Sequence, residues 1–253
     1  EEKYLLVVNA SNIEKNLNWI ISHNTKYNCS INNISDKISL LAVQGPKADL
    51  LCESFTKEDL KSLSNYSFIL GTFAGIEDVI ISKTGYTGSG GFELYISNDD
   101  VEHIWDKLFT VENLEVKPIG LGARDTLRIE MGYCLYGNDI DESVTPIEAN
   151  LGWITKLETN FIGSKSIKEK IENGIKKKLV GFVINDKGIP RKGYEIFDKS
   201  EKLIGQVTSG TFSPILKKGI GLGYIETNIS SKEIYLKIRN NFIKLEVVKT
   251  PFI

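Results

Sequence analysis

The chain changes character near Lys178, and this change constrains the fold more than any other sequence feature. Beyond it, segments of strand-forming residues are separated by Gly, Asn and Ser, and no stretch has helical periodicity. Six such segments follow one another: LVGFVI, GYEIF, LIGQVTSG, GLGYIE, EIYLKI and FIKLEVV. Closely spaced short strands are typical of sandwiches and barrels. The sequence therefore predicts an all-β, barrel-like C-terminal domain over residues 175–253, with its boundary at the lysine-rich junction 174–178.

Before this junction, predicted helices are mixed with strands and include a β-rich segment, and the predicted fold class is α+β. A chain of 253 residues is long for one compact domain, so two or three packed units are expected. The run YLLVV predicts a buried strand at residues 4–8, and Ser11 with Glu14 predicts a capping box for the next helix. Further elements are predicted as strands at residues 37–43, 66–73 and 79–83, and as helices at residues 46–55, 101–109 and 164–174.

The first residues suggest that the sequence is incomplete at its start. Glu1 and Glu2 stand directly before the predicted strand, and there is no initiator methionine. A core strand rarely opens a natural chain. We therefore expect an N-terminal portion to precede Glu1.

Charge and cysteine content exclude several classes of function. With 31 basic and 33 acidic residues the formal charge is -2, so there is no electrostatic footprint for nucleic acid. Cys29, Cys52 and Cys134 lack metal-ligand spacing, which predicts buried thiols in a reducing compartment and no metal site. No apolar run is long enough to span a bilayer, and the N-terminus has no targeting pattern. The sequence thus predicts a cytoplasmic protein with neither a nucleic-acid nor a membrane partner.

The stretch from residue 120 to 153 combines a charged helix, glycine turns and an apolar return. A helix is predicted at residues 121–133, with an apolar stripe formed by Ala123, Leu127 and Met131. Asp125 can pair with Arg128 at i,i+3, which leaves Arg124 without a local partner and free to bind a ligand. Helix geometry alone favours the alternative, in which Arg124 is a solvated or ion-paired residue.

The segment TGYTGSGGFELY at residues 84–95 places four glycines between two predicted strands. It lacks the Lys-Ser/Thr ending of a phosphate-binding loop and leads into a strand, so one reading is a simple glycine-rich hairpin. The other reading is a ligand site. Tyr86 offers a flat face for a heteroaromatic ring, and Glu93 offers a carboxylate for that ring's N–H groups.

Asn9 presents a similar choice. It follows the predicted strand at residues 4–8 and precedes a helix, where α/β folds often place ligand-binding polar groups. An Asn at such a place is as often a turn-former that bonds its own backbone. Geometry alone leaves both readings open.

Taken together, these segments resemble the T-protein of the glycine cleavage system, the aminomethyltransferase family. The resemblance covers essentially the whole chain and rests on several long segments: LVVNASNIEKNLNWI, LLAVQGPKA, KTGYTGSGGFELY, LGARDTLRIEMGYCLYGNDI, TPIEANLGW and VVKTPF. One departure is the lack of an acidic residue after TGYTG, at a place where such sequences vary.

The resemblance implies a multidomain, cloverleaf-like arrangement around a folate channel. Residues 1–34 and 119–174 would form part of one α/β folate-binding domain, and residues 35–118 part of a second folate-binding domain of the α+β class. The implied reaction transfers the aminomethyl carbon from the dihydrolipoyl arm of lipoylated H-protein to tetrahydrofolate and releases ammonia. Position by position, the residues implied to bind folate or line its pocket are Asn9, Tyr86, Glu93 and Arg124, with Tyr66 and Trp153 as further pocket-lining aromatics.

The family's catalytic aspartate is implied to lie upstream of Glu1, so no catalytic residue is assigned within this sequence. The resemblance therefore predicts that residues 1–253 made alone do not transfer the aminomethyl group above background, whereas a version extended to the aspartate does. Two alternatives remain open: a catalytically inactive folate-binding or regulatory module, and the folate domain of a sarcosine or dimethylglycine dehydrogenase. A related iron–sulfur assembly branch with a reactive cysteine is disfavoured, because MGYCLYGND predicts a buried structural thiol at Cys134.

Overall fold

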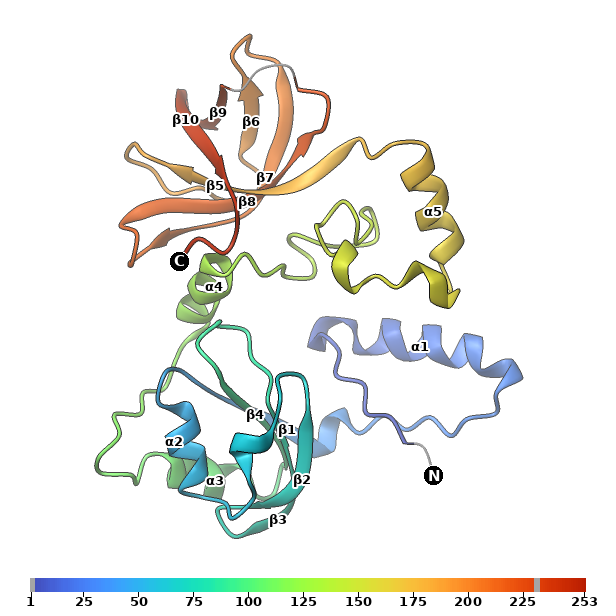
Figure 1. The fold of residues 1–253 in the computed structure, drawn as a ribbon, viewed down its shortest axis with the longest axis vertical. Helices are drawn as coiled ribbons and strands as arrows, with labels where there is room; N and C mark the ends of the chain where they lie inside the picture. The colour runs from blue at the N-terminus through green and yellow to red at the C-terminus, as the bar shows by residue number, and fades with distance from the viewer. Residues whose placement is uncertain (1–2, 230–232) are drawn as a thin grey trace. The chain divides into compact units, whose positions relative to one another are not determined.

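A computed structural model describes residues 3–229 and 233–253 (Figure 1). The chain divides into two compact units by its internal contacts. Unit 1 contains residues 1–85 and 89–117, and unit 2 contains residues 86–88 and 118–253. The finer domain division given by the resemblance stays a prediction.

Unit 1 is built on a four-stranded antiparallel sheet. The strands are β1 (Ile38–Gln44), β2 (Phe68–Phe73), β3 (Ile76–Ser82) and β4 (Gly91–Ser97), in the order β1-β4-β3-β2. Side chains alternate across the sheet, so Phe92, Leu94 and Ile96 all enter one core. The helices α2 (Ala48–Glu53) and α3 (Val101–Leu108) cover this face with Leu51, Ile104 and other apolar side chains. The sheet is therefore covered on one face by helices, and Glu93 lies on the other face.

The structure contradicts the strand expected at residues 4–8. These residues form no strand, and their large apolar side chains are exposed, from 79% for Tyr4 to 38% for Val8. A short helix η1 (Ala10–Asn12) precedes α1 (Ile13–His23), whose N-cap is Asn12 without a side-chain cap bond, so the capping box of Ser11 and Glu14 is also wrong. An apolar run can form a buried strand only where a partner strand supplies hydrogen bonds, and sequence alone does not show that partner.

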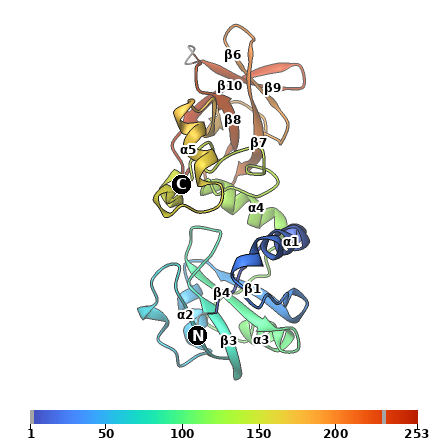
Figure 2. The same cartoon turned by 90° about the vertical axis from the view of Figure 1, so that its right-hand side faces the viewer.

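Unit 2 ends in the predicted barrel, coloured from orange to red in Figure 2. Its six strands close in the order β10-β5-β8-β7-β6-β9, and every pair is antiparallel. All six predicted segments are strands, with the following bounds: β5 (Lys177–Ile184), β6 (Glu195–Asp198), β7 (Leu203–Ser213), β8 (Lys218–Glu226), β9 (Ile234–Ile238) and β10 (Asn241–Val248). Closure leaves no free sheet edge and encloses a core that includes Phe182, Ile196 and Leu236.

Two helices precede the barrel, α4 (Leu121–Glu130) and α5 (Ser164–Glu172). The predicted helix at residues 121–133 ends three residues early, because Gly132 adopts a left-handed φ of 70°. The N–H of Gly132 then donates to Ile129 O at 2.8 Å, and that of Tyr133 donates to Arg128 O at 2.8 Å. This pair of bonds is a Schellman motif, which satisfies carbonyls that the helix end leaves free.

The buried face of α4 also differs from the prediction. Ala123 is exposed and Leu127 and Met131 are half-buried, whereas Arg128, Ile129 and Glu130 are fully buried. Ile129 packs against Val183 and Ile220 of the barrel. The helix thus buries its C-terminal end, two charged side chains included, in place of an apolar stripe.

Candidate functional site

The glycine-rich loop between β3 and β4 is held at its base by Gln44. The side-chain amide of Gln44 donates to Thr84 O and to Phe92 O, both at 3.2 Å. Gly90 and Gly91 have φ values of 77° and 121°, which only glycine adopts readily. A side chain at Gly91 would place its Cβ 2.1 Å from Val43 O. The loop conformation, and with it the start of β4, therefore depends on glycine.

Glu93 stands on β4 between the buried Phe92 and Leu94, on the opposite face of the sheet. Its Oε2 accepts a hydrogen bond of 2.5 Å from Thr84 Oγ1, and within the described residues its Oε1 has no partner. Thr84 fixes one oxygen of a half-buried carboxylate and leaves the other to accept a donor.

Tyr86 belongs to unit 2, where both its ring and its hydroxyl are held. The hydroxyl donates to Cys134 O at 2.5 Å, and the ring stacks on that of Tyr133 with centroids 5.7 Å apart. Burial raises the pKa of Tyr86 to about 12, so the phenol stays protonated and continues to donate at neutral pH. The predicted flat face is therefore presented in a fixed orientation.

Arg124 lies on the exposed part of α4, with its guanidinium 5.0 Å from the centre of the Tyr86 ring. Asp125 pairs with Arg128 at 2.7 Å, as predicted from their spacing. Among the described residues, Arg124 forms no ion pair with a carboxylate, and its guanidinium contacts the Tyr86 ring. A guanidinium over an aromatic face keeps its N–H groups available for an anion.

The other candidate residues are exposed. Asn9 precedes η1, where its backbone carbonyl accepts from Asn12 N at 2.9 Å and its side chain makes no cap bond. Tyr66 is 82% exposed, and Trp153 is 69% exposed in η5 (Gly152–Ile154). Asn9, Tyr66 and Glu93 belong to unit 1, and Tyr86, Arg124 and Trp153 belong to unit 2. Of the six residues, the structure brings Tyr86 and Arg124 into contact.

Comparison with known proteins gives the family. The model of the GCVT N-terminal domain matches residues 1–159, and that of the glycine cleavage T-protein C-terminal barrel domain matches residues 177–253. The chain belongs to the glycine cleavage T-protein family.

Curated relatives and a solved structure agree with this assignment. The aminomethyltransferase of Flavobacterium psychrophilum is 52% identical over 255 residues, covering 100% of this chain and 71% of that protein. That of Bacteroides thetaiotaomicron is 52% identical, covering 99% and 71%. The crystal structure of aminomethyltransferase T from Bartonella henselae superposes with a TM-score of 0.87 at 30% identity, covering 97% of this chain and 67% of that one. This member of the T-protein family therefore has the fold of that crystal structure over almost the whole of its own length.

Unit 2 also contains a buried ionic network that the sequence did not reveal. The Arg128 side chain is 1% exposed and donates to Asp139 Oδ2 at 2.6 Å, to Ser209 Oγ at 2.8 Å and to Tyr133 O at 3.0 Å. Thr208 Oγ1 donates to Asp139 Oδ1 at 2.5 Å. Helical periodicity gives no hint that an arginine turns inward. The sequence signal was the pair of adjacent hydroxyl side chains Thr208 and Ser209 in β7 of the barrel.

The three cysteine thiols differ in their burial. Cys52 is buried and Cys134 half-buried, and burial raises the pKa of Cys134 to about 11, so it is a thiol at neutral pH, in line with a structural role. Cys29 is exposed, contrary to the prediction, because Asn24 bonds its backbone in an irregular segment outside the core. Within residues 3–229 and 233–253, no group of three His, Cys, Asp or Glu side chains could hold a metal ion. In the same residues, no helix is long and apolar enough to cross a membrane.

Lys170 on α5 holds a buried carboxylate, which gives a testable stability effect. Its Nζ lies 2.7 Å from Glu148 Oε2, and Glu148 is 2% exposed. Burial raises the pKa of Glu148, but the bonds from Lys170 and Thr145 outweigh this and hold it below its ordinary value. We expect Lys170→Met to lower the free energy of unfolding at neutral pH by about 1–2 kcal/mol.

The pH dependence follows from the lowered pKa. A carboxyl with a lowered folded-state pKa stabilises fully above its unfolded value, about 4.3, and this contribution is lost as the pH falls through the folded value. The difference between wild type and Lys170→Met in urea unfolding should therefore shrink in acid. Lys168→Met, an exposed neighbour on α5, is the control. An equal effect of the two substitutions at neutral pH would show that the contact contributes nothing.

Proposed function

We propose that this chain binds tetrahydrofolate and acts in the transfer of the aminomethyl carbon from the dihydrolipoyl arm of a lipoylated H-protein, with release of ammonia. The observation that carries the proposal is the Arg124 guanidinium over the fixed face of Tyr86, without a carboxylate partner among the described residues. Membership of the family supports the class of reaction, and the relatives' name, aminomethyltransferase, favours it over an inactive module or a dehydrogenase domain.

Separate roles are proposed for the residues. Glu93 accepts hydrogen bonds from the amino and ring N–H groups of the pterin, because its Oε1 has no partner among the described side chains. Tyr86 presents its ring to folate, and Arg124 binds an anionic group of the same ligand. Asn9, Tyr66 and Trp153 are proposed as pocket-lining residues on the family resemblance alone. Tetrahydrofolate, when bound, supplies the acceptor of the one-carbon unit.

Three carboxylates near the candidate site are already engaged in hydrogen bonds or ion pairs, and none of them is assigned the role of catalytic acid. Asp125 and Asp139 both pair with Arg128, and Glu93 accepts from Thr84. General acid–base catalysis needs a positioned group that is free to exchange its proton. We propose that none of these three carboxylates is the catalytic acid.

A cytoplasmic location is proposed on the three free thiols, which suit a reducing compartment.

Glu93→Gln tests the proposal, because the substitution keeps the size of the side chain and removes its charge. Losing a charge-assisted hydrogen bond should weaken tetrahydrofolate binding by about 1.5–3 kcal/mol, roughly a 10- to 150-fold rise in Kd. Calorimetric titration measures the change. The matched control is Glu77→Gln, an exposed carboxylate on β3 of the same unit. Equal affinity of Glu93→Gln and wild type, or no binding by the wild type, would contradict the proposed role.

A further inference from the structure

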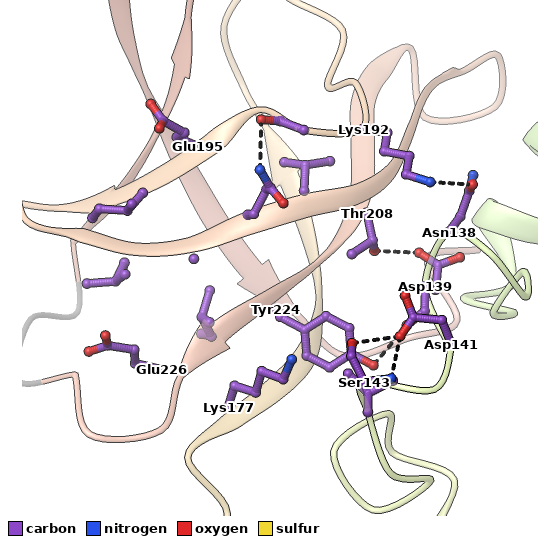
Figure 3. Close-up of a pocket in the computed structure, with 18 of the residues that line it drawn as sticks. Asn138, Asp139, Asp141, Ser143, Lys177, Lys192, Glu195, Thr208, Tyr224 and Glu226 are labelled. Atoms are coloured by element: carbon purple, nitrogen blue, oxygen red, sulfur yellow. Dashed lines mark hydrogen bonds between the residues drawn. The ribbon is translucent and has the colours of Figure 1, made fainter.

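Unit 2 contains a cavity of about 650 Å³ beside β7 and β8 (Figure 3). Its walls come from residues 137–144, from the turn before β6 and from the two facing strands. Volumes of roughly 300–1,000 Å³ are typical of small-molecule sites. None of the residues proposed above to bind folate lines the cavity. It is therefore a candidate for a second ligand.

One part of the cavity wall carries two ammonium groups that lack a carboxylate partner in the described chain. Lys192 Nζ donates to two neutral acceptors, Gly137 O at 2.7 Å and Asn138 Oδ1 at 3.0 Å. Lys177 Nζ lies 5.1 Å from the centre of the Tyr224 ring. Two carboxylates lie in the same wall: Asp141 bonds Ser143, and Asp139 pairs with the buried Arg128. The two ammonium groups therefore face the cavity without an ion pair of their own among the described residues.

The other part of the wall carries an unpaired carboxylate. Glu195, at the start of β6, is exposed and has no partner within the described residues, whereas Glu226 pairs with Lys202 at 2.9 Å. Gln206 Nε2 donates to Gly193 O at 3.3 Å, which leaves its carbonyl oxygen as a further acceptor. Figure 3 shows Glu195 and Lys192 toward opposite sides of the cavity. The cavity is thus dipolar.

The charge pattern selects the class of ligand. A simple anion would meet Glu195 and Asp141, and a simple cation would meet Lys177 and Lys192. A ligand that carries both charges satisfies both ends. We propose that this cavity binds a small zwitterion, with its carboxylate at Lys177 and Lys192 and its ammonium at Glu195; free amino acids and short peptides have this chemistry.

The test uses triglycine as the probe and the whole chain as the receptor. Calorimetric titration should give saturable binding at millimolar concentration. Lys177→Met, Lys192→Met and Glu195→Gln should each raise the Kd about tenfold or more, because each removes a charged partner of the ligand. The matched controls, Lys165→Met and Glu158→Gln, change exposed side chains outside the cavity lining and should leave the Kd unchanged.

Blocked peptides test each end by itself. N-acetyl-triglycine lacks the ammonium, so it should bind more weakly than triglycine and be insensitive to Glu195→Gln. Triglycine amide lacks the carboxylate, so it should be insensitive to Lys177→Met. The proposal would be overturned if triglycine did not bind at millimolar concentration, if the blocked peptides bound as tightly as triglycine, or if the three cavity substitutions left the Kd unchanged.

Discussion

Asp139→Ala is expected to lower the free energy of unfolding of unit 2 by about 3–5 kcal/mol, the cost of removing one partner from a buried ion pair. Asp139 is 1% exposed and binds Arg128, Thr208, Ser209 and the backbone N–H of Leu135. The substitution leaves the guanidinium of Arg128 buried without its main counter-charge. Urea unfolding, followed together with amide hydrogen exchange in β7 and β8, measures the loss.

Two further variants make this expectation specific. Asp139→Asn keeps an acceptor for Arg128 but removes the charge, so it should cost less than Asp139→Ala. Asp141→Ala removes an exposed aspartate two residues away, whose carboxylate bonds Ser143, and should change stability by less than about 0.5 kcal/mol. If Asp139→Ala were as stable as Asp141→Ala, the network would not stabilise unit 2.

Gly91→Ala is expected to destabilise unit 1 strongly. The φ of 121° belongs to a region that is essentially restricted to glycine and costs other residues about 1–3 kcal/mol. The new Cβ would also lie 2.1 Å from Val43 O, and relieving such a contact costs roughly 1–3 kcal/mol more. Gly91 pairs with Gln44, so a backbone movement that relieves the contact would separate β4 from β1 at the base of the glycine loop.

Gly90→Ala is the matched control for this substitution. Its φ of 77° is also left-handed, but a Cβ at this position meets no atom within 4 Å. Gly90→Ala should therefore lower the free energy of unfolding only by the cost of placing alanine in a left-handed conformation, about 1–2 kcal/mol. Thermal unfolding of the two variants separates close approach from backbone conformation. Equal melting temperatures would show that Val43 O moves aside without cost.

The barrel was predictable from sequence because its strands follow one another along the chain. Each segment from β5 to β10 carries strand-forming residues and is bounded by turn residues of its own, so local patterns were sufficient. The run at residues 4–8 has an equally clear apolar pattern, yet it forms no strand. Strand formation there depends on a distant pairing partner, and sequence pattern does not encode that partner.

The candidate site was predictable in part. The i,i+3 pairing of Asp125 with Arg128 follows from helix geometry, and among the described residues no carboxylate pairs with Arg124. The inward course of Arg128 could not be predicted, because it depends on Asp139 and Ser209, 11 and 81 residues further along the chain. Binding of folate by the six candidate residues stays a prediction.

The Schellman turn after α4 has a consequence for how this protein can change. Tyr133 is held at both ends of its backbone by one residue: its N–H donates to Arg128 O, and its carbonyl accepts from the Arg128 guanidinium. Its ring in turn supports Tyr86, over which Arg124 lies. Substitutions in the interior of unit 2 are therefore expected to move the Tyr86 ring and the Arg124 guanidinium beside it. Selection for heat tolerance, acting on Arg128 and its partners, would also move the Tyr86 and Arg124 side chains, so stability and the geometry of this pair would evolve together.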